Sequence, residues 1–453
     1  MLVKNSGARA IVTFTEFRTS VVKILEGLEC QLLTTDQVIP GVLDGGMPDL
    51  DQTVRSDDIA FLQHSSGTTG LQKGVALSHR AVLNQIEAYS RAIDLQPDDR
   101  IVSWLPIYHD MGLIAGFVLP LVTGNPLIIM SPFHWVRDPK LLLWAIQEYA
   151  GTLCWLPNFA FNHLARSIRP RDLEGLDLST WRAAINCSEP VRFASHQLFL
   201  DRFSQYGFKS ESLASCYAMA ENTFAVTQSR LGEAPHIEWI DLQSLQEQGR
   251  AVISTVELNS ATPMVSCGFP IPGVEVSVAD GKGYLLPQRQ VGEIILRSDS
   301  MLSGYYHRPD LTAQAIKNGW YHTGDMGYLA DGHLYVTGRK KDLIIVGGKN
   351  IYPQDLEAIA GLIPGIYPGR AVAFGVMDEK LGTESIVMVC ELQDHYSEAE
   401  KLQITRQLRT QVVQQIGVIL SDVRLVEKRW VLKTSSGKIA RSRNRDKYLK
   451  EFR

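Results

Sequence analysis

The chain has 453 residues and a formal net charge of −4 at pH 7, with 45% hydrophobic and 21% charged residues. These fractions are those of a globular protein with a sizeable core, and they exclude global disorder. No overall basic excess indicates nucleic-acid binding. Six cysteines without a Cys-x-x-Cys pair exclude a disulfide scaffold, so we expect a cytoplasmic protein with reduced thiols and no structural zinc.

Short apolar segments alternate with longer amphipathic ones over most of the chain, a pattern typical of an α/β fold. Ser78 is a suitable N-cap for one predicted helix, and Asp138 followed by Pro139 suits the start of a second. The predicted strands are 59–63, 101–105, 152–156, 181–186, 292–297 and 334–337, and the predicted helices are 78–94 and 138–149.

After Gly338 the alternation restarts on a smaller scale, with strands predicted at 342–346, 371–376 and 385–391 and a helix at 398–416. We therefore predict two α/β domains. The large one, built of several subdomains, spans residues 1–338, and the small one spans residues 339–453.

The segment from Met111 to Phe133 carries no charged residue and is long enough for a membrane span. Three prolines and several glycines within it oppose one continuous helix. We predict instead a buried helix, a turn at Thr123-Gly124-Asn125 and a buried strand at 127–130, and no membrane span.

A stretch of small and hydroxyl residues follows the first strand of the large domain. It reads Ser65, Ser66, Gly67, Thr68, Thr69, Gly70, Leu71, Gln72, Lys73 and Gly74. Small residues let backbone N–H groups approach anionic oxygens, and hydroxyl groups and a lysine add donors and charge. The spacing is neither a Walker A loop nor the dinucleotide pattern Gly-x-Gly-x-x-Gly. The stretch resembles the signature loop of adenylate-forming enzymes, which include acyl-CoA synthetases, luciferases and peptide-synthetase adenylation domains.

Two further motifs resemble the adenine and metal segments of that family. Tyr217-Ala218-Met219-Ala220-Glu221 is similar to its Tyr-Gly-x-x-Glu motif, which implies that Tyr217 and Ala218 lie against adenine. The same resemblance implies that Glu221, with Ser65, holds Mg²⁺ between the phosphates. Asn186-Cys187-Ser188-Glu189-Pro190 resembles the Gly-Ala-Glu-Pro edge, so Ser188, Glu189 and Pro190 are expected beside the nucleotide.

Three motifs later in the chain resemble the ribose, hinge and C-terminal segments of the family. Tyr321-His322-Thr323-Gly324-Asp325 implies that Asp325 accepts hydrogen bonds from the ribose, and Gly338-Arg339-Lys340-Lys341-Asp342 implies Arg339 on the ribose and Lys341 as the pivot. Ser436-Gly437-Lys438 is similar to the motif whose lysine reaches the substrate carboxylate and the α-phosphate.

The resemblance implies that a carboxylic acid is activated by ATP to acyl-AMP, with release of pyrophosphate, and that a phosphopantetheine thiol then takes the acyl group. The substrate carboxylate and ATP are both anions, so the main task of the active site is to neutralise their charges. Lys73, with Mg²⁺ on Glu221, would hold the pyrophosphate. The small, mobile domain would then rotate about Lys341, removing Lys438 from the site and bringing Gly347 and Gly348 to the thiol tunnel.

Several segments resemble fatty acyl-AMP ligases in particular, and the resemblance implies that His109 lies by the substrate carboxylate. Three apolar residues of the uncharged segment either line an acyl tunnel or belong to the core, namely Phe117, Leu119 and Leu121. Asp110 suits an ammonium partner, so a substrate acid that carries an amino group is a further alternative. The segments are 104–113, 156–161, 265–268 and 352–355.

Two acceptors of the acyl group remain as alternatives, an acyl carrier protein and free CoA. Many fatty acyl-AMP ligases carry an extra segment that restrains the C-terminal domain, and residues 315–325 contain no clear insertion. Residues 424–453 hold eleven Lys or Arg and three Asp or Glu, a net +8 that indicates either a solvated tail or a surface for an acidic partner. Family members have roughly a hundred more residues ahead of a segment like 5–12, so the first subdomain is expected to be incomplete. A truncated, non-catalytic binding paralogue is therefore a third alternative.

Overall fold

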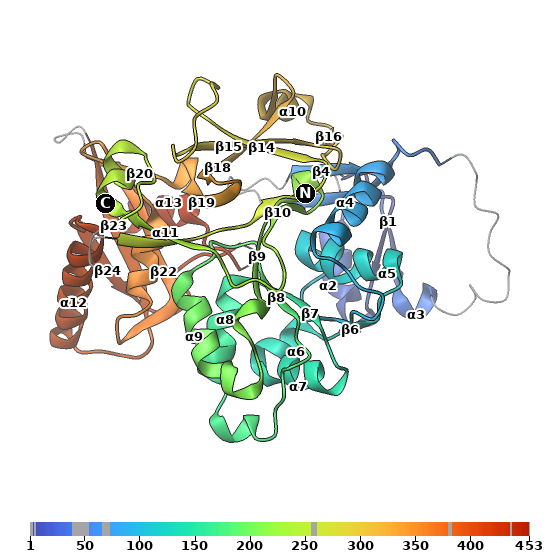
Figure 1. The fold of residues 1–453 in the computed structure, drawn as a ribbon, viewed down its shortest axis with the longest axis horizontal. Helices are drawn as coiled ribbons and strands as arrows, with labels where there is room; N and C mark the ends of the chain where they lie inside the picture. Colours follow the sequence, from blue (N-terminus) through green and yellow to red (C-terminus); the bar gives the residue numbers. More distant parts are fainter. Residues whose placement is uncertain are drawn as a thin grey trace.

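The computed structural model describes residue 3 and residues 6–38, 54–65, 73–254, 261–378, 383–434 and 437–452. It is an α/β structure with a large N-terminal domain and a smaller C-terminal domain, as the sequence predicted. Figure 1 shows the C-terminal elements, coloured orange to red, gathered on one side of the molecule. Among the described residues, no buried core cluster combines residues before 338 with residues after 343.

The central sheet of the large domain has the strand order β13-β10-β9-β8-β7-β5-β6. Its strands from β6 to β9 are parallel, and β10 and β13 are antiparallel to their neighbours. Parallel strands end at one edge of a sheet, and ligands bind in the crevice outside that edge. The strands are β5 (Ile101–Ser103), β6 (Leu127–Ile129), β7 (Leu153–Leu156), β8 (Ala183–Asn186), β9 (Leu213–Ala218), β10 (Ala225–Gln228) and β13 (Phe269–Pro270).

The helices around this sheet begin close to the predicted positions. Ser78 caps α4 (His79–Ala92), because its hydroxyl oxygen accepts a hydrogen bond from the Ala81 N–H at 3.1 Å, as predicted. Helix α7 (Lys140–Glu148) starts later than predicted, with Pro139 in the N-cap position and no side-chain cap. Other helices of the large domain are α2 (Arg18–Leu25), α3 (Thr35–Val38), α6 (Pro132–Arg137), α8 (Asn158–Ser167), α9 (Phe193–Phe203) and α10 (Pro309–Ala315).

The uncharged segment after Asp110 folds as a π-helix (Met111–Val118), continues as α5 (Leu119–Thr123) and turns at Gly124, whose φ is +79°. The predicted helix, turn and strand are confirmed. The expected burial of the strand is wrong, because β6 is an edge strand and Ile129 is 54% exposed. No helix in the part of the chain that the structure describes is long and apolar enough to cross a membrane.

Smaller sheets complete the large domain. β15 pairs with β14 and β18, and β18 also pairs with β17 and β19. Other pairings are β16-β4-β3, β11-β12 and β1-β2. Their bounds are β1 (Ala10–Thr13), β2 (Gln31–Thr34), β3 (Ile59–Ser65), β4 (Lys73–Ser78), β11 (Ile237–Asp241), β12 (Ala261–Val265), β14 (Val274–Ala279), β15 (Gly292–Ser298), β16 (Gly304–Tyr305), β17 (Ile316–Lys317), β18 (Trp320–Ala330) and β19 (His333–Arg339).

The C-terminal domain contains the sheet β22-β23-β24 and the hairpin β20-β21. The predicted helix 398–416 is confirmed as α12 (Glu398–Ile416), which starts at a capping box of Ser397 and Glu400 and ends before Gly417, whose φ is +74°. The other bounds are β20 (Ile344–Val346), β21 (Lys349–Ile351), α11 (Pro353–Ala360), β22 (Ile366–Asp378), β23 (Thr383–Leu392), β24 (Asp422–Val426) and α13 (Arg441–Phe452).

Candidate active site

Tyr217, Asp325 and Arg339 meet where β9, β18 and β19 come together. The Tyr217 hydroxyl donates to Asp325 Oδ2 at 2.7 Å, and Arg339 Nε lies 3.0 Å from Asp325 Oδ1. Burial and the charge of Asp325 raise the pKa of Tyr217, so its phenol stays a neutral donor. A carboxylate has about four acceptor positions, which leaves Asp325 able to accept from further hydroxyl groups.

A second cluster joins Lys73, Glu221 and Tyr305. The Tyr305 hydroxyl donates to Glu221 Oε1 at 3.0 Å and lies 2.9 Å from the Tyr321 hydroxyl. Lys73 Nζ lies over the Tyr305 ring, 4.6 Å from its centroid. Sequence reasoning missed Tyr305, which β16 brings to this point by pairing with Val75 of β4. No motif recognised in the sequence includes it.

His109 and Asp110 are in contact at the start of the π-helix, with Nδ1 2.5 Å from Oδ1. Asp110 also accepts from the Met111 N–H at 2.8 Å. Burial raises the pKa of Asp110, but His109, the charge of Lys438 and the Met111 N–H outweigh it, so the pKa lies below its ordinary value.

The loop after β8 carries Ser188, Glu189 and Pro190 at the carboxyl edge of the central sheet, where the neighbouring parallel strand β9 also ends. Ser188 has a φ of +68°, a strained conformation for a serine. One Glu189 oxygen accepts from the Phe159 N–H at 2.9 Å, at the first turn of α8. This carboxylate therefore fixes the loop against the helix.

A buried polar network lies beneath that loop. Asn186 Nδ2 donates to Asn158 Oδ1 at 3.0 Å and lies 3.0 Å from His196 Nε2. Asn158 Oδ1 also accepts from the Arg192 N–H at 3.1 Å, and Asn158 Nδ2 donates to the Ser195 hydroxyl at 3.0 Å. Burial lowers the pKa of His196 to about 4, so the ring is neutral at neutral pH.

The hinge segment forms a short 3-10 helix of Lys340–Asp342 in which Lys341 is exposed. Asp342 is 2.9 Å from Arg441 Nη1, and Arg441 Nη2 is 2.6 Å from Glu357 Oε2. These ion pairs connect the hinge with the start of α13, just after the segment that carries Lys438.

Several contacts join the two domains away from the hinge. Arg192 Nη1 lies 2.6 Å from Asp355 Oδ1, and Lys349 Nζ lies 2.9 Å from Glu247 Oε1. Gln246, beside Glu247, donates to the Ile416 carbonyl at 3.3 Å. The segment between β11 and β12 therefore contacts the C-terminal domain in this arrangement.

Gly347 and Gly348 form the two-residue turn of the β20-β21 hairpin, with φ values of +55° and +83°. Two positive φ values are the reason for glycine at this turn. Both residues are exposed, and a Cβ placed on either would meet nothing within 4 Å. Their proposed role at a thiol tunnel stays a prediction.

Most of the predicted phosphate loop lies outside the described residues, namely Ser66, Gly67, Thr68, Thr69, Gly70, Leu71 and Gln72, and so does Ser436. Ser65 is described only as the last residue of β3, where it pairs with Lys73. Of the three apolar residues considered for an acyl tunnel, Leu119 is buried, whereas Phe117 and Leu121 are 39% and 70% exposed. Only Leu119 belongs to the closed core.

Comparisons with known proteins find relatives of this chain in both sequence and fold. The family model of the AMP-binding enzymes matches residues 1–306. The putative ligase Rv1013 of Mycobacterium tuberculosis is 34% identical over 440 residues, covering 96% of this chain and 79% of its own length. The medium-chain-fatty-acid–[acyl-carrier-protein] ligase JamA of Moorena producens is 33% identical over 408 residues, covering 87% and 69%. A solved structure from a study of fatty acyl-adenylate ligases of E. coli and L. pneumophila has a TM-score of 0.91 at 32% identity, covering 100% and 80%.

Proposed function

Because the chain belongs to the family of AMP-binding enzymes, we propose that it activates a fatty acid with ATP to acyl-AMP and transfers the acyl group to the phosphopantetheine thiol of an acyl carrier protein. The observation that carries this proposal is that separate motifs of the chain meet in space, since Tyr305 contacts both Lys73 and Glu221, and Asp325 contacts both Tyr217 and Arg339. This retained set of charged groups argues against a non-catalytic binding paralogue.

In the first step a carboxylate oxygen of the acid attacks the α-phosphorus of ATP. The new bond joins that oxygen to phosphorus, and the bond to the bridging oxygen of the β-phosphate breaks, so pyrophosphate leaves. Lys438 screens the repulsion between the two anions, since lysine is a compact and mobile point charge. His109, held by Asp110, sits beside the incoming carboxylate.

Glu221 is the proposed ligand of Mg²⁺, which neutralises charge on the phosphates when it is bound. Mg²⁺ is usually held by one or two protein carboxylates together with water and phosphate oxygens, so a single carboxylate at this point fits it. Tyr305 holds Glu221 Oε1 and carries Lys73 on its ring face, which orients both charged groups toward the same region.

The nucleotide roles of the remaining residues are proposed on the same basis. Asp325 and Arg339 hold the ribose, and Tyr217 with Ala218 lies along the adenine. Ser188, Glu189 and Pro190 form the adenine edge, and the phosphate loop from Ser65 to Lys73 surrounds the phosphates. A division into domains of residues 1–338 and 339–453, with Lys341 as the pivot, is supported by the separate buried cores on either side.

In the second step the thiol sulfur attacks the acyl carbon, the bond to the AMP oxygen breaks, and AMP leaves. The name of JamA supports a carrier protein as acceptor. Basic residues at 424–453 suit an acidic carrier, with an effect mainly on the association rate.

The deciding experiment measures ATP–pyrophosphate exchange with a panel of carboxylic acids, followed by transfer to free CoA or to a carrier protein. We expect exchange with aliphatic acids and transfer to the carrier. An amino acid as the best substrate would indicate Asp110 as an ammonium partner, and efficient transfer to CoA alone would identify an acyl-CoA synthetase. No exchange with any acid would support a binding protein.

A further inference from the structure

Glu293 contacts both the turn that carries Asp325 and the first residue of the hinge. Its Oε1 accepts from the Gly324 N–H at 3.1 Å, and its Oε2 accepts from Lys340 Nζ at 3.0 Å. The side chain is only 11% exposed. One carboxylate therefore bridges two segments whose motifs imply separate roles.

The first of these segments is a bulge in β18. Glu293 pairs with Met326 and Ile295 pairs with His322, and the register shifts between the two pairs. Bulges of this kind redirect side chains and are common next to active sites. The bulge contains Gly324, whose φ is +72°, and Asp325, whose side chain turns toward Tyr217.

Thr323 also holds the bulge in place through hydrogen bonds. The Thr323 hydroxyl donates to the Ile294 carbonyl at 2.7 Å and accepts from the Asp325 N–H at 3.0 Å. Glu293 supplies the contact to the N–H of the residue between them. Through Lys340, Glu293 also connects the bulge to the hinge, beside the ion pair of Asp325 with Arg339.

The second segment begins at Lys340, directly after Arg339 of β19. Arg339 pairs with Asp325 across the strands, so the bulge and the start of the hinge lie next to each other. Glu293 also lies 3.3 Å from His322 Nδ1. Burial raises the pKa of Glu293, but Lys340 and His322 outweigh it, so the carboxylate stays charged.

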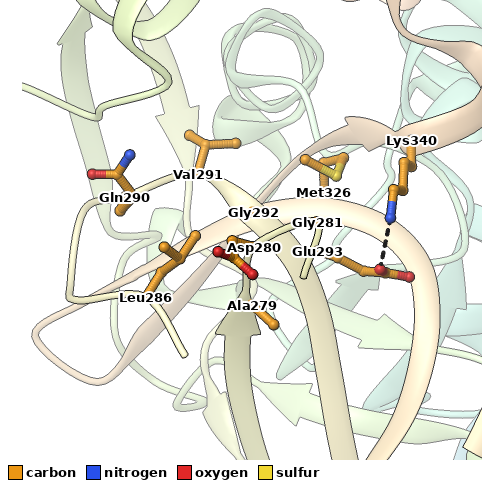
Figure 2. Close-up of a pocket in the computed structure, with 10 residues that line it drawn as sticks. All are labelled: Ala279, Asp280, Gly281, Leu286, Gln290, Val291, Gly292, Glu293, Met326 and Lys340. Atoms are coloured by element: carbon orange, nitrogen blue, oxygen red, sulfur yellow. Dashed lines mark hydrogen bonds and ion pairs between the residues drawn. The ribbon is translucent and has the colours of Figure 1, made fainter. Parts of the chain in front are cut away.

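A cavity of about 220 Å³ borders this ion pair. Figure 2 shows Glu293 and Lys340 on one side of it, joined by a dashed line, with Leu286 and Gln290 on the opposite side. Half of the Lys340 side chain is exposed, so the ammonium group can leave the carboxylate without displacing packed atoms.

We propose that Glu293 is a positioning residue that couples the ribose-binding turn to the hinge. It keeps Asp325 and the start of the hinge in a fixed position relative to each other. This inference rests on the proposed function, because it uses Asp325 as the ribose acceptor. Glu293 touches neither the nucleotide nor the reacting atoms. It acts through Gly324 on one side and through Lys340 on the other.

The test compares Glu293→Gln with Lys340→Met in pyrophosphate exchange, using ATP and 2′,3′-dideoxy-ATP. Glutamine keeps an acceptor for Gly324 but removes the charge that holds Lys340, whereas Lys340→Met removes only the hinge contact. Glu275→Gln is the matched control, because Glu275 is an exposed acid on the neighbouring strand β14 that pairs with Arg297.

We expect Glu293→Gln to raise the KM for ATP about tenfold, in line with the loss of hydrogen bonds to a charged group, and to leave the KM for the dideoxy nucleotide nearly unchanged. Lys340→Met should have a smaller effect in the same direction, and the double variant should be no worse than Glu293→Gln. Glu275→Gln should behave as wild type.

Equal effects on both nucleotides, or a lower melting temperature with an unchanged KM for ATP, would overturn the inference and leave Glu293 a structural residue. Additive effects of the two substitutions would also overturn it, since coupled residues are not additive. If the wild-type protein does not distinguish ATP from the dideoxy nucleotide, or shows no exchange, it is the proposed function that fails.

Discussion

Arg192 of the large domain and Asp355 of the C-terminal domain form an ion pair, with Nη1 2.6 Å from Oδ1. Arg192 precedes α9 and follows the adenine-edge loop, whereas Asp355 lies in the first turn of α11. The pair therefore joins the proposed nucleotide side of the large domain to the domain that carries Lys438. The rotation of the C-terminal domain proposed above would break this pair.

Asp355→Asn should consequently weaken this arrangement and slow adenylation. Both side chains are partly exposed, so the pair contributes at most about 1 kcal/mol and the expected loss in pyrophosphate exchange is about fivefold or less. Acyl transfer from supplied acyl-AMP should be unchanged or faster. Asp394→Asn, which alters an exposed acid of the same domain, is the control. Equal losses in both half-reactions would show that the pair stabilises the fold instead.

Lys438→Ala should separate the two half-reactions. Removing one charge contact made in the transition state costs on the order of 10² in rate, so acyl-AMP formation should fall by at least about that factor. Thioester formation from supplied acyl-AMP should survive, because the rotated domain takes the lysine away. Single-turnover assays of each step measure this, with Lys433→Ala as a neighbouring lysine for comparison. Equal damage to both steps would contradict the two-arrangement mechanism.

Glu221→Ala should impair adenylation and weaken its dependence on Mg²⁺. Tyr305→Phe should have a milder effect of about tenfold, because it removes the hydroxyl that donates to Glu221 but keeps the ring beneath Lys73. A magnesium titration of pyrophosphate exchange distinguishes them, since only Glu221→Ala removes a ligand. An unchanged rate and magnesium dependence in Glu221→Ala would remove this carboxylate from the site.

His196 should make the stability of the large domain depend on pH. Its folded pKa of about 4 lies below the unfolded value near 6.5, so the unfolded chain binds the extra proton between these pH values. The stability contribution is complete above about pH 6.5 and is lost as the pH falls toward 4, by about 3 kcal/mol.

His196→Gln keeps an acceptor for Asn186 and should flatten that part of the profile in urea unfolding at a series of pH values. The exposed His395 provides the control, as His395→Gln should leave the profile unchanged. A profile of His196→Gln that runs parallel to wild type would show that His196 does not titrate in this range.

Features encoded by neighbouring residues were predictable from the sequence. The bounds of α12 and the cap of α4 follow from Ser397, Glu400, Gly417 and Ser78, which act on backbone groups within a few residues. The family resemblance rests on short motifs of the same local kind. The burial of β6 was not predictable, because a strand at the edge of a sheet and one at its centre can have the same apolar sequence.

By itself the sequence determined the α/β class, the family, and the segments that carry Lys73, Glu221, Asp325, Arg339 and Lys438. Only the tertiary structure decided which side chains connect these segments. Tyr305 reaches Glu221 across 84 positions of the chain, and Glu293 reaches Lys340 across 47. Such contacts depend on the pairing and register of strands far apart in sequence. A shift of one residue in that register would turn each side chain to the opposite face, so no local pattern specifies them.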